Sequence, residues 1–240
     1  GEAHALNLRD SGLGVIVGAR PGQQSDASAR AAGFETRDLE AAAGAAATVA
    51  VMLPDEVVPG RWAVLRAALR ADALVVFAHG YNLLYGALDF PARADVVLVS
   101  PTAPGRILRE RFEHGEGVPA YLAVHRDGSG GAWAGAEAYA HGIGSARAGL
   151  LRTTVREETE VDLFGEQVVL CGGMNALVTA AFETLVERGY SREVAYLECV
   201  HQLAHLAELL RQRGVAGLRD GISATALYGG MRAGELGGLQ

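Results

Sequence analysis

The chain has 240 residues, half of them hydrophobic, so it is long enough to bury a core and to form one or two domains. Its net charge of −7 argues against a nucleic-acid partner, which would require a basic surface. All 21 basic residues are arginine, which excludes every mechanism that depends on a lysine side chain.

The opening residues, 1–12, form a helical pattern that no strand precedes. A dinucleotide-binding fold begins with a strand and a glycine-rich turn, which brings the pyrophosphate to the N-terminus of the following helix. Gly1 has the place of the last glycine of such a turn. We therefore expect the printed sequence to lack an upstream strand of its natural protein.

Short apolar runs rich in β-branched residues follow, and such runs are typical of strands buried on both faces of a parallel sheet. They cover residues 14–18, 48–53, 73–78, 96–99 and 120–124. Helical patterns at 25–32 and 61–69 lie between them. The alternation predicts a Rossmann-like, doubly wound α/β domain over residues 1–153, whose ligands bind beyond the carboxyl ends of the strands.

The pattern changes from about Thr154 to long helices, which we expect over residues 160–188 and 191–213. Gly214 is a natural end for the second of them. This change predicts an all-helical domain over residues 154–240. No segment reaches the roughly 18 apolar residues that span a membrane, so we expect a cytoplasmic protein without a membrane partner.

Two carboxylates, Asp162 and Glu166, stand at i and i+4 and so share one face of the first long helix. Buried acids on one face repel each other unless a cation or protons intervene, and magnesium prefers carboxylate oxygen ligands. The alternative is that the two acids lie in an exposed first turn of the helix, where their negative charges interact favourably with the helix dipole. The pattern alone leaves both interpretations open.

The second long helix repeats this spacing with Glu198 and Gln202 in apolar surroundings. A buried acid and amide need polar partners, and a metal shared with the first helix would supply them. A surface glutamate is the alternative for Glu198. His201 and His205 also stand at i and i+4, but the glutamate of a zinc-protease motif is missing between them.

Taken together, these features resemble the ketol-acid reductoisomerases, in their shorter class, almost from end to end. The matching segments are 4–12, 53–56, 77–82, 142–144, 147–149, 157–167 with 171–173, 195–201, 222–225 and 228–229. The resemblance implies a magnesium-dependent alkyl migration and an NADPH-dependent reduction in branched-chain amino-acid synthesis. It also implies a Rossmann domain followed by a knotted helical domain, and a homodimer that completes the active site.

Carried over by position, the resemblance assigns the catalytic residues. Asp162, Glu166 and Glu198 would bind two magnesium ions, with Asp162 bridging them and Glu198 reaching in from the partner subunit. Ser223 would contact the substrate through its hydroxyl, and His79 would be the catalytic histidine beside the nicotinamide.

The resemblance assigns cofactor contacts as well. Arg20 and Ser25 match residues near the adenosine ribose phosphate, and an arginine there favours NADP(H) over NAD(H). NAD(H) stays open, because Gln23 and Gln24 replace small residues of the family. The remaining predicted cofactor contacts are Gly1, Asp55, Glu56, His79 and Gly105.

Two departures from the family pattern concern the reaction itself. Thr102 stands where the family has a lysine that serves the substrate and the metals, and Gln202 stands where a second glutamate is expected. The loss of one cation and one anion leaves the net charge of this region unchanged. We therefore interpret the two substitutions as a functional adjustment of the active site. We therefore expect a magnesium- and NAD(P)H-dependent oxidoreductase, a divergent paralogue that acts on a related small keto or hydroxy acid. The alternative is a non-catalytic homologue that acts as a binding or scaffold dimer.

Overall fold

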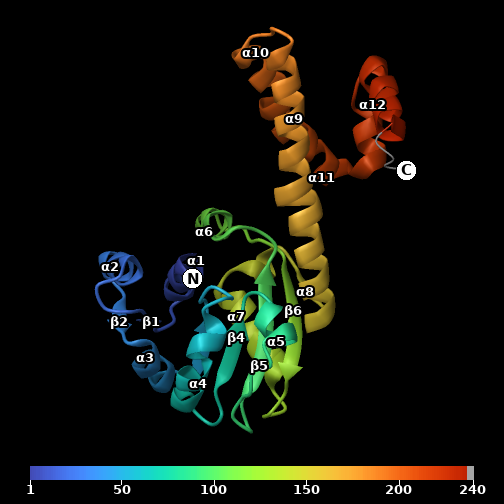
Figure 1. Cartoon of the computed structure of the whole chain (residues 1–240). Helices are drawn as coiled ribbons and strands as arrows, with labels where there is room; N and C mark the ends of the chain where they lie inside the picture. The colour runs from blue at the N-terminus through green and yellow to red at the C-terminus, as the bar shows by residue number, and fades with distance from the viewer. Residues whose placement is uncertain (237–240) are drawn as a thin grey trace. The chain divides into compact units, whose positions relative to one another are not determined.

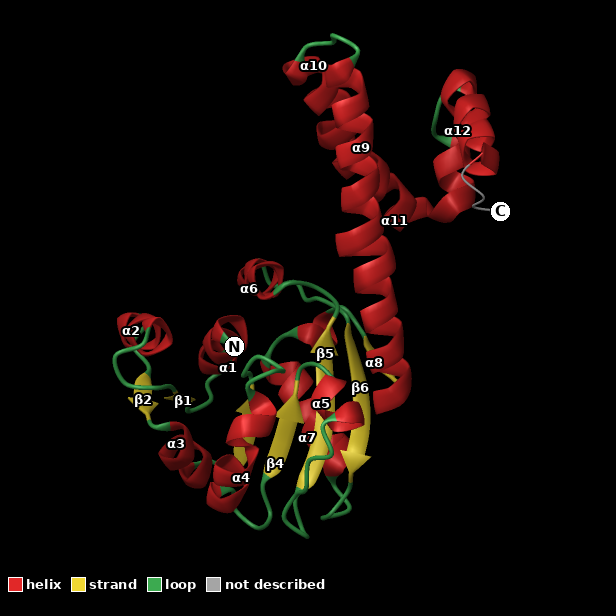
Figure 2. Cartoon of the chain, viewed as in Figure 1, coloured by secondary structure: helices red, strands yellow, loops and turns green. Residues whose placement is uncertain are grey.

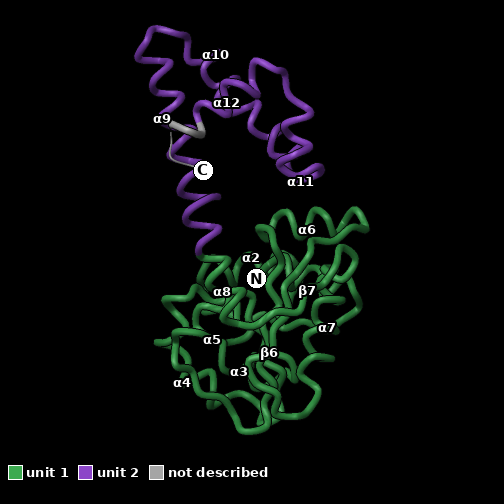
Figure 3. The backbone as a smooth tube through the Cα atoms, turned by 90° about the vertical axis from the view of Figure 1, so that its right-hand side faces the viewer, with its two compact units in different colours: residues 1–163 green, residues 164–240 purple. Residues whose placement is uncertain are grey.

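The computed structural model describes residues 1–236 and divides into two compact units, Gly1–Leu163 and Phe164–Gln240 (Figures 1 and 3). The first unit combines strands with helices, and the described part of the second is helical (Figure 2). This confirms the predicted class, an α/β domain followed by an all-helical one. The boundary predicted after residue 153 lies between the last strand and the next helix, upstream of the division between the units.

The main sheet has the strand order β3–β4–β5–β6–β7. Its strands are Thr48–Val51, Leu74–Phe77, Asp95–Pro101, Ala120–Arg126 and Leu150–Arg152. Neighbours pair in parallel except β5 and β6, which are antiparallel. The predicted parallel character of the sheet is confirmed except at this pair, because an apolar run indicates burial but does not encode strand direction.

A second, two-stranded parallel sheet joins β1, Ile16–Gly18, to β2, Glu35–Arg37. Within the described residues β1 pairs only with β2, and β3 pairs only with β4. The sequence Glu-Thr-Arg of β2 is polar and its burial is slight, so its pattern did not predict a strand.

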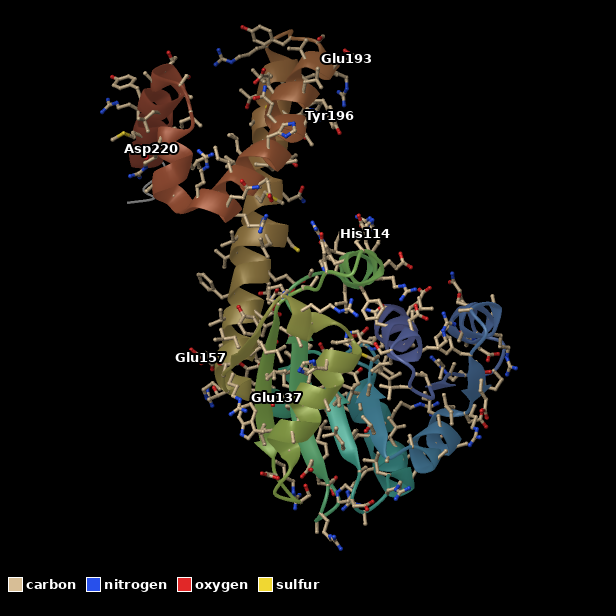
Figure 4. The ribbon with its side chains drawn as sticks, turned by 180° about the vertical axis from the view of Figure 1, so that it is seen from behind. His114, Glu137, Glu157, Glu193, Tyr196 and Asp220 are labelled. Carbon is tan, nitrogen blue, oxygen red and sulfur yellow. The ribbon has the colours of Figure 1, made fainter. Side chains whose placement is uncertain are left out.

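Helices cover both faces of the main sheet, and their bounds follow. In the first unit they are α1 Glu2–Asp10, α2 Gln24–Ala31, α3 Leu39–Ala45, α4 Val58–Ala68, α5 Tyr81–Tyr85, α6 Gly105–Glu113, α7 Ala132–Gly142 and α8 Val155–Phe164, with a short 3-10 turn at Ser145–Arg147. Successive strand residues point to opposite faces: Val75 belongs to one hydrophobic cluster with Trp62 of α4, whereas Val76 belongs to another with Ala136 of α7. The label of Glu137 marks α7 in Figure 4. Each fully buried valine contributes about 1.5–3 kcal/mol, so this double cover fixes the strand ends that carry the site.

Polar contacts fix α1 against α6 and α7. Arg109 donates to Asn7 Oδ1 at 2.9 Å and to Asp10 Oδ2 at 2.7 Å. The same guanidinium pairs with Glu113 through Nε at 2.9 Å. Asn7 is fully buried and donates to the carbonyl oxygen of Ile143 at 3.0 Å. The opening helix predicted from the sequence is therefore an integral layer of the first unit.

The second unit contains α9 Met174–Glu187, α10 Arg192–Tyr196, α11 Gln202–Asp220 and α12 Ala224–Leu236. Two π-helical segments precede α9 and α11, at Gly165–Gly173 and Leu197–His201. Gly214 interrupts the helical backbone with a φ of 66°, so α11 consists of two helices joined at a kink, and the predicted helix end at Gly214 is confirmed. Among residues 164–233 only Ala195 is buried, so this unit has almost no core of its own.

The helix that includes α8, the first π segment and α9, Val155–Glu187, is long and apolar enough to cross a membrane. Its most apolar 18-residue window has a mean hydropathy of 1.5, and none of that window is buried within the chain. The expectation that no segment reaches this apolarity was wrong, because the average tolerates the polar residues that interrupt the apolar run. One such helix is weak evidence for a membrane, since interface helices have the same composition.

Candidate active site

The site of the first unit begins where two neighbouring parallel strands end. Asp55 follows β3 and His79 follows β4, and the carboxyl ends of parallel strands lie at one edge of the sheet. His79 Nδ1 lies 2.8 Å from Asp55 Oδ2. Asn82 Nδ2 donates to Asp55 Oδ1 at 2.7 Å and to its carbonyl oxygen at 3.1 Å, so the carboxylate that orients the imidazole is itself held in place.

The other imidazole nitrogen faces α8. His79 Nε2 lies 3.3 Å from Asp162 Oδ2, without the alignment of a hydrogen bond. In a neutral imidazole, a proton on Nδ1 that is donated to Asp55 leaves Nε2 as the acceptor. The ring also stacks on Tyr81, with the two planes 9° apart and the centroids 6.4 Å apart. His79 is thus held between two acids, with Nε2 buried and without a hydrogen-bond partner among the described residues.

A glycine permits this approach of α8. A Cβ atom on Gly80 would lie 1.9 Å from Thr159 Oγ1 and 2.9 Å from Glu158 Oε2, both on α8. Thr159 is fully buried and its hydroxyl donates to the Val155 carbonyl at 2.7 Å. The turn after β4 therefore touches α8 directly, and any larger residue at position 80 would push Asp162 away from His79.

Glu158 is the most deeply buried acid of the site, with 3% of its surface exposed. Burial raises the pKa of its carboxyl above the ordinary value and the charge of Asp162 raises it further, while a hydrogen bond from Ser100 and the nearby His79 act in the opposite direction. Its Oε1 atom is buried without a hydrogen-bond partner in the described part of the chain. Glu158 can therefore hold a proton inside the site.

The other residues predicted for the cofactor lie around α1 and in the loops after β1 and β3. Gly1 precedes α1 close to Met52, since a Cβ atom on Gly1 would lie 3.2 Å from Met52 Cβ. Gly105 begins α6 and approaches α1, where a Cβ atom would lie 3.6 Å from Ala3 Cβ. Arg20 belongs to the loop between β1 and α2, Ser25 lies in the first turn of α2, and Glu56 is exposed beside Asp55.

Thr102, in place of the expected lysine, is tied to the backbone. Its hydroxyl and its amide both donate to the Pro119 carbonyl oxygen, each at 2.9 Å. It also lines an open cavity of about 450 Å³ with Tyr121, Leu150 and Leu151. The side chain at this position thus supplies neither a charge nor a free donor.

The remaining predicted residues, Glu166, Gln202, Glu198 and Ser223, all lie in the second unit and are exposed there. Glu166 belongs to the first π-helical segment and Glu198 to the second. Such segments occur mostly as local distortions at functional sites. The convergence of these residues with Asp162 stays a prediction.

Within residues 1–236 no group of three or more His, Cys, Asp or Glu side chains is arranged to hold a metal ion. The donors predicted by position, Asp162, Glu166 and Glu198, are nevertheless all carboxylates. An all-oxygen donor set suits magnesium and not the softer transition metals. The chemistry of the donors therefore fits the ion.

Two family models match the chain. The NADPH-binding domain of acetohydroxy acid isomeroreductase matches residues 1–149, and the C-terminal domain of ketol-acid reductoisomerase matches residues 155–236. The chain belongs to the ketol-acid reductoisomerase family. The shorter-class resemblance found in the sequence is confirmed, and an oxidoreductase with a domain that binds a nicotinamide cofactor follows.

Solved structures agree with this family. An NADH-preferring ketol-acid reductoisomerase from an uncultured archean is 38% identical, covers 98% of this chain and 73% of its own, and has a TM-score of 0.92. A putative oxidoreductase from Jannaschia sp. CCS1 covers 98% of this chain and 85% of its own, at 16% identity and a TM-score of 0.71. A semialdehyde dehydrogenase NAD-binding protein from Cupriavidus necator covers 98% and 86%, at 18% identity and the same TM-score. The last two show a shared fold alone.

Glu158, Ser100 and Asn82 belong to this site although their sequence positions did not predict a role for them. A signal was present for Glu158, which stands four residues before Asp162 and so shares its face of the helix. Ser100 and Asn82 gave no comparable signal, because their roles depend on which strand ends adjoin in the sheet.

Replacing Glu158 by glutamine should raise stability at neutral pH. The raised pKa means that the folded state binds more protons than the unfolded state, so stability falls as pH rises through the ordinary glutamate range. Glu158→Gln removes this loss. Chemical denaturation should show a more stable variant at pH 7 and convergence with the natural chain near pH 4. Glu157→Gln, exposed on the same helix, is the matched control, and a destabilised Glu158→Gln at pH 7 would refute the assignment.

Proposed function

We propose that the protein is a magnesium-dependent reductoisomerase that rearranges a small 2-hydroxy-3-keto acid by alkyl migration and reduces the product with NAD(P)H. The observation that carries this proposal is the arrangement Asp55–His79–Asp162 at the carboxyl end of the sheet, with the buried Glu158, whose pKa is raised by burial, beside it. Reduction of a ketone needs a proton as well as a hydride, and these groups can supply it.

Magnesium, when bound by Asp162, Glu166 and the partner subunit's Glu198, would polarise the substrate oxygens and stabilise negative charge. The chain's own groups have separate tasks. Asp55 orients the His79 ring, and His79 moves a proton at Nε2. Glu158, buried on α8, would hold a second proton. Ser223 would bind the substrate through its hydroxyl.

For the cofactor we propose NADP(H). Arg20 in the loop after β1 supports this choice, because a guanidinium there can neutralise a 2′-phosphate. The NADH preference stated for the archean relative favours NAD(H) as the second candidate. Both cofactors deliver the same hydride, so the proposed reaction does not depend on the choice.

Asp162→Asn should lower kcat by about 10³-fold, because it removes a charge at the metals and from the face of His79. The full chain, supplied with Mg²⁺ and NADPH or NADH, is assayed by loss of absorbance at 340 nm against 2-acetolactate and related 2-hydroxy-3-keto acids. Calorimetry measures binding of the cofactor and Mg²⁺ in parallel. The control Glu157→Gln should keep full activity. Unchanged turnover in Asp162→Asn would contradict the proposal, and a natural chain that binds neither ligand would favour the non-catalytic scaffold instead.

We further propose that the substrate differs from the usual one of the family. Thr102, held by the Pro119 carbonyl, is neutral, and Gln202 is neutral where an acid is expected. Thr102 and Gln202 would suit a substrate that needs one fewer contact with a positively charged side chain. The apolar cavity beside Thr102 supports a larger or less polar substituent.

Restoring the pair should therefore restore the usual specificity. The double variant Thr102→Lys with Gln202→Glu is expected to raise kcat/KM on 2-acetolactate by about tenfold or more, because it returns a cation to the reacting oxygens. Thr102→Lys alone should gain less, since its charge is unbalanced. Steady-state kinetics of the natural chain and both variants measure this. Equal or lower kcat/KM in the double variant would contradict a retuned site.

We propose a homodimer whose subunits bury the second unit against each other, in a cytoplasmic protein. Exposed apolar side chains on this unit support the dimer: Phe164, Val168, Val169, Leu170, Met174, Leu177, Val215, Tyr228 and Met231. Large exposed apolar patches on a protein commonly mark interaction sites. A second copy would cover it and would bring Glu198 to its partner's site.

Leu177, with 72% of its surface exposed, is a sharp test of the dimer. Leu177→Asp should convert the dimer to a monomer, because an unpaired carboxylate is costly in an apolar contact. Light scattering after size exclusion measures the mass of the natural chain and the variant. Glu183→Gln, an exposed change in the same helix, should leave the mass unchanged. A monomeric natural chain would overturn the proposal.

A further inference from the structure

The loop between β1 and α2, residues 19–23, is organised by a buried acid that the site above does not use. Asp26, in the first turn of α2, keeps only 8% of its surface exposed. Its Oδ2 accepts a hydrogen bond from the Gly22 amide at 3.2 Å, and its Oδ1 accepts one from Arg30 Nε at 2.9 Å. Asp26 thus connects the tip of the loop to the helix that follows it.

The backbone of the loop is fixed at further points. Ala19 is buried and donates its amide to the Arg37 carbonyl of β2 at 2.9 Å. The Gln23 amide donates to the Arg20 carbonyl at 3.2 Å, which closes a turn around Gly22. Gly22 has a φ of 76°, a conformation that glycine adopts without strain. The amide of this glycine donates the hydrogen bond to Asp26.

The arginines around the loop differ in their partners. Arg30 pairs with Asp26, and Arg37 pairs with Glu35 at 2.7 Å. Arg20 is exposed and forms no ion pair within residues 1–236. A guanidinium without a carboxylate partner can receive a phosphate in bidentate geometry. Ser25, whose hydroxyl could add a contact, is exposed in the first turn of α2, on the other side of the Gly22 turn.

We propose that Asp26 is a positioning residue that holds this loop so that Arg20 and Ser25 receive the 2′-phosphate of NADP(H). The inference rests on the proposed nicotinamide-dependent function. An acid near this loop could instead bind the ribose hydroxyls and favour NAD(H). That role needs an exposed carboxylate, whereas Asp26 is buried and both its oxygens have partners.

The test compares two small probes, 2′,5′-ADP and 5′-AMP, by calorimetry on the full chain. Asp26→Ala should weaken 2′,5′-ADP binding by about tenfold, the scale of one lost charge-assisted hydrogen bond, and should change 5′-AMP binding less than about twofold. Arg20→Gln should produce the same selective loss. A role confined to stability would weaken both probes alike.

Asp26→Asn separates positioning from folding. It keeps an oxygen acceptor for the Gly22 amide and loses the charge, so it should recover most of the 2′,5′-ADP affinity. Asp38→Asn, an exposed acid before α3, is the matched control and should bind both probes normally. Thermal melting followed by circular dichroism establishes that each variant is folded.

The outcomes are distinct. Tighter 2′,5′-ADP binding by Asp26→Ala would overturn the inference and show that the acid repels the phosphate. Equal binding of the two probes by the natural chain would also overturn it, while the proposed function would stand with NADH as the reductant. A natural chain that binds neither probe nor either reduced cofactor would overturn both.

Discussion

The direct contact between α8 and the turn after β4 is the constraint on which the site depends. Gly80 has no side chain, so Thr159 and Glu158 can lie against its backbone. This contact brings Asp162 within reach of His79 and takes Glu158 out of water. The contact between α8 and the turn after β4 therefore sets both the distance between His79 and Asp162 and the raised pKa of Glu158. A change in one would change the other.

The sequence predicted this arrangement in part. The spacing of the acids and the strand-helix alternation are local patterns, and they predicted the fold class and the face on which Asp162 lies. The contact between Asp162 and His79 could not be predicted from spacing, because it depends on how α8 returns to the sheet. The direction of β6 and the polar strand β2 were missed for a related reason, since the pairing of strands decides them and their own residues do not.

The two units differ in how they achieve stability. The first buries valines on both faces of a sheet, whereas the second leaves almost every side chain at least partly exposed. A helical segment without a core depends on surfaces outside itself for its free energy of folding. Its π-helical segments, at Glu166 and Glu198, carry a further local cost. In the proposed dimer, assembly and completion of the active site would be one event.

Arg109 illustrates what the lack of lysine means for this protein. Its planar guanidinium contacts Asn7, Asp10 and Glu113 at once. An ammonium group would titrate near pH 10 and could be acylated. No side chain of this sequence offers an acceptor for acetylation or ubiquitin attachment through an amine. Enzymes that modify side-chain amines therefore cannot change the surface charge of this sequence.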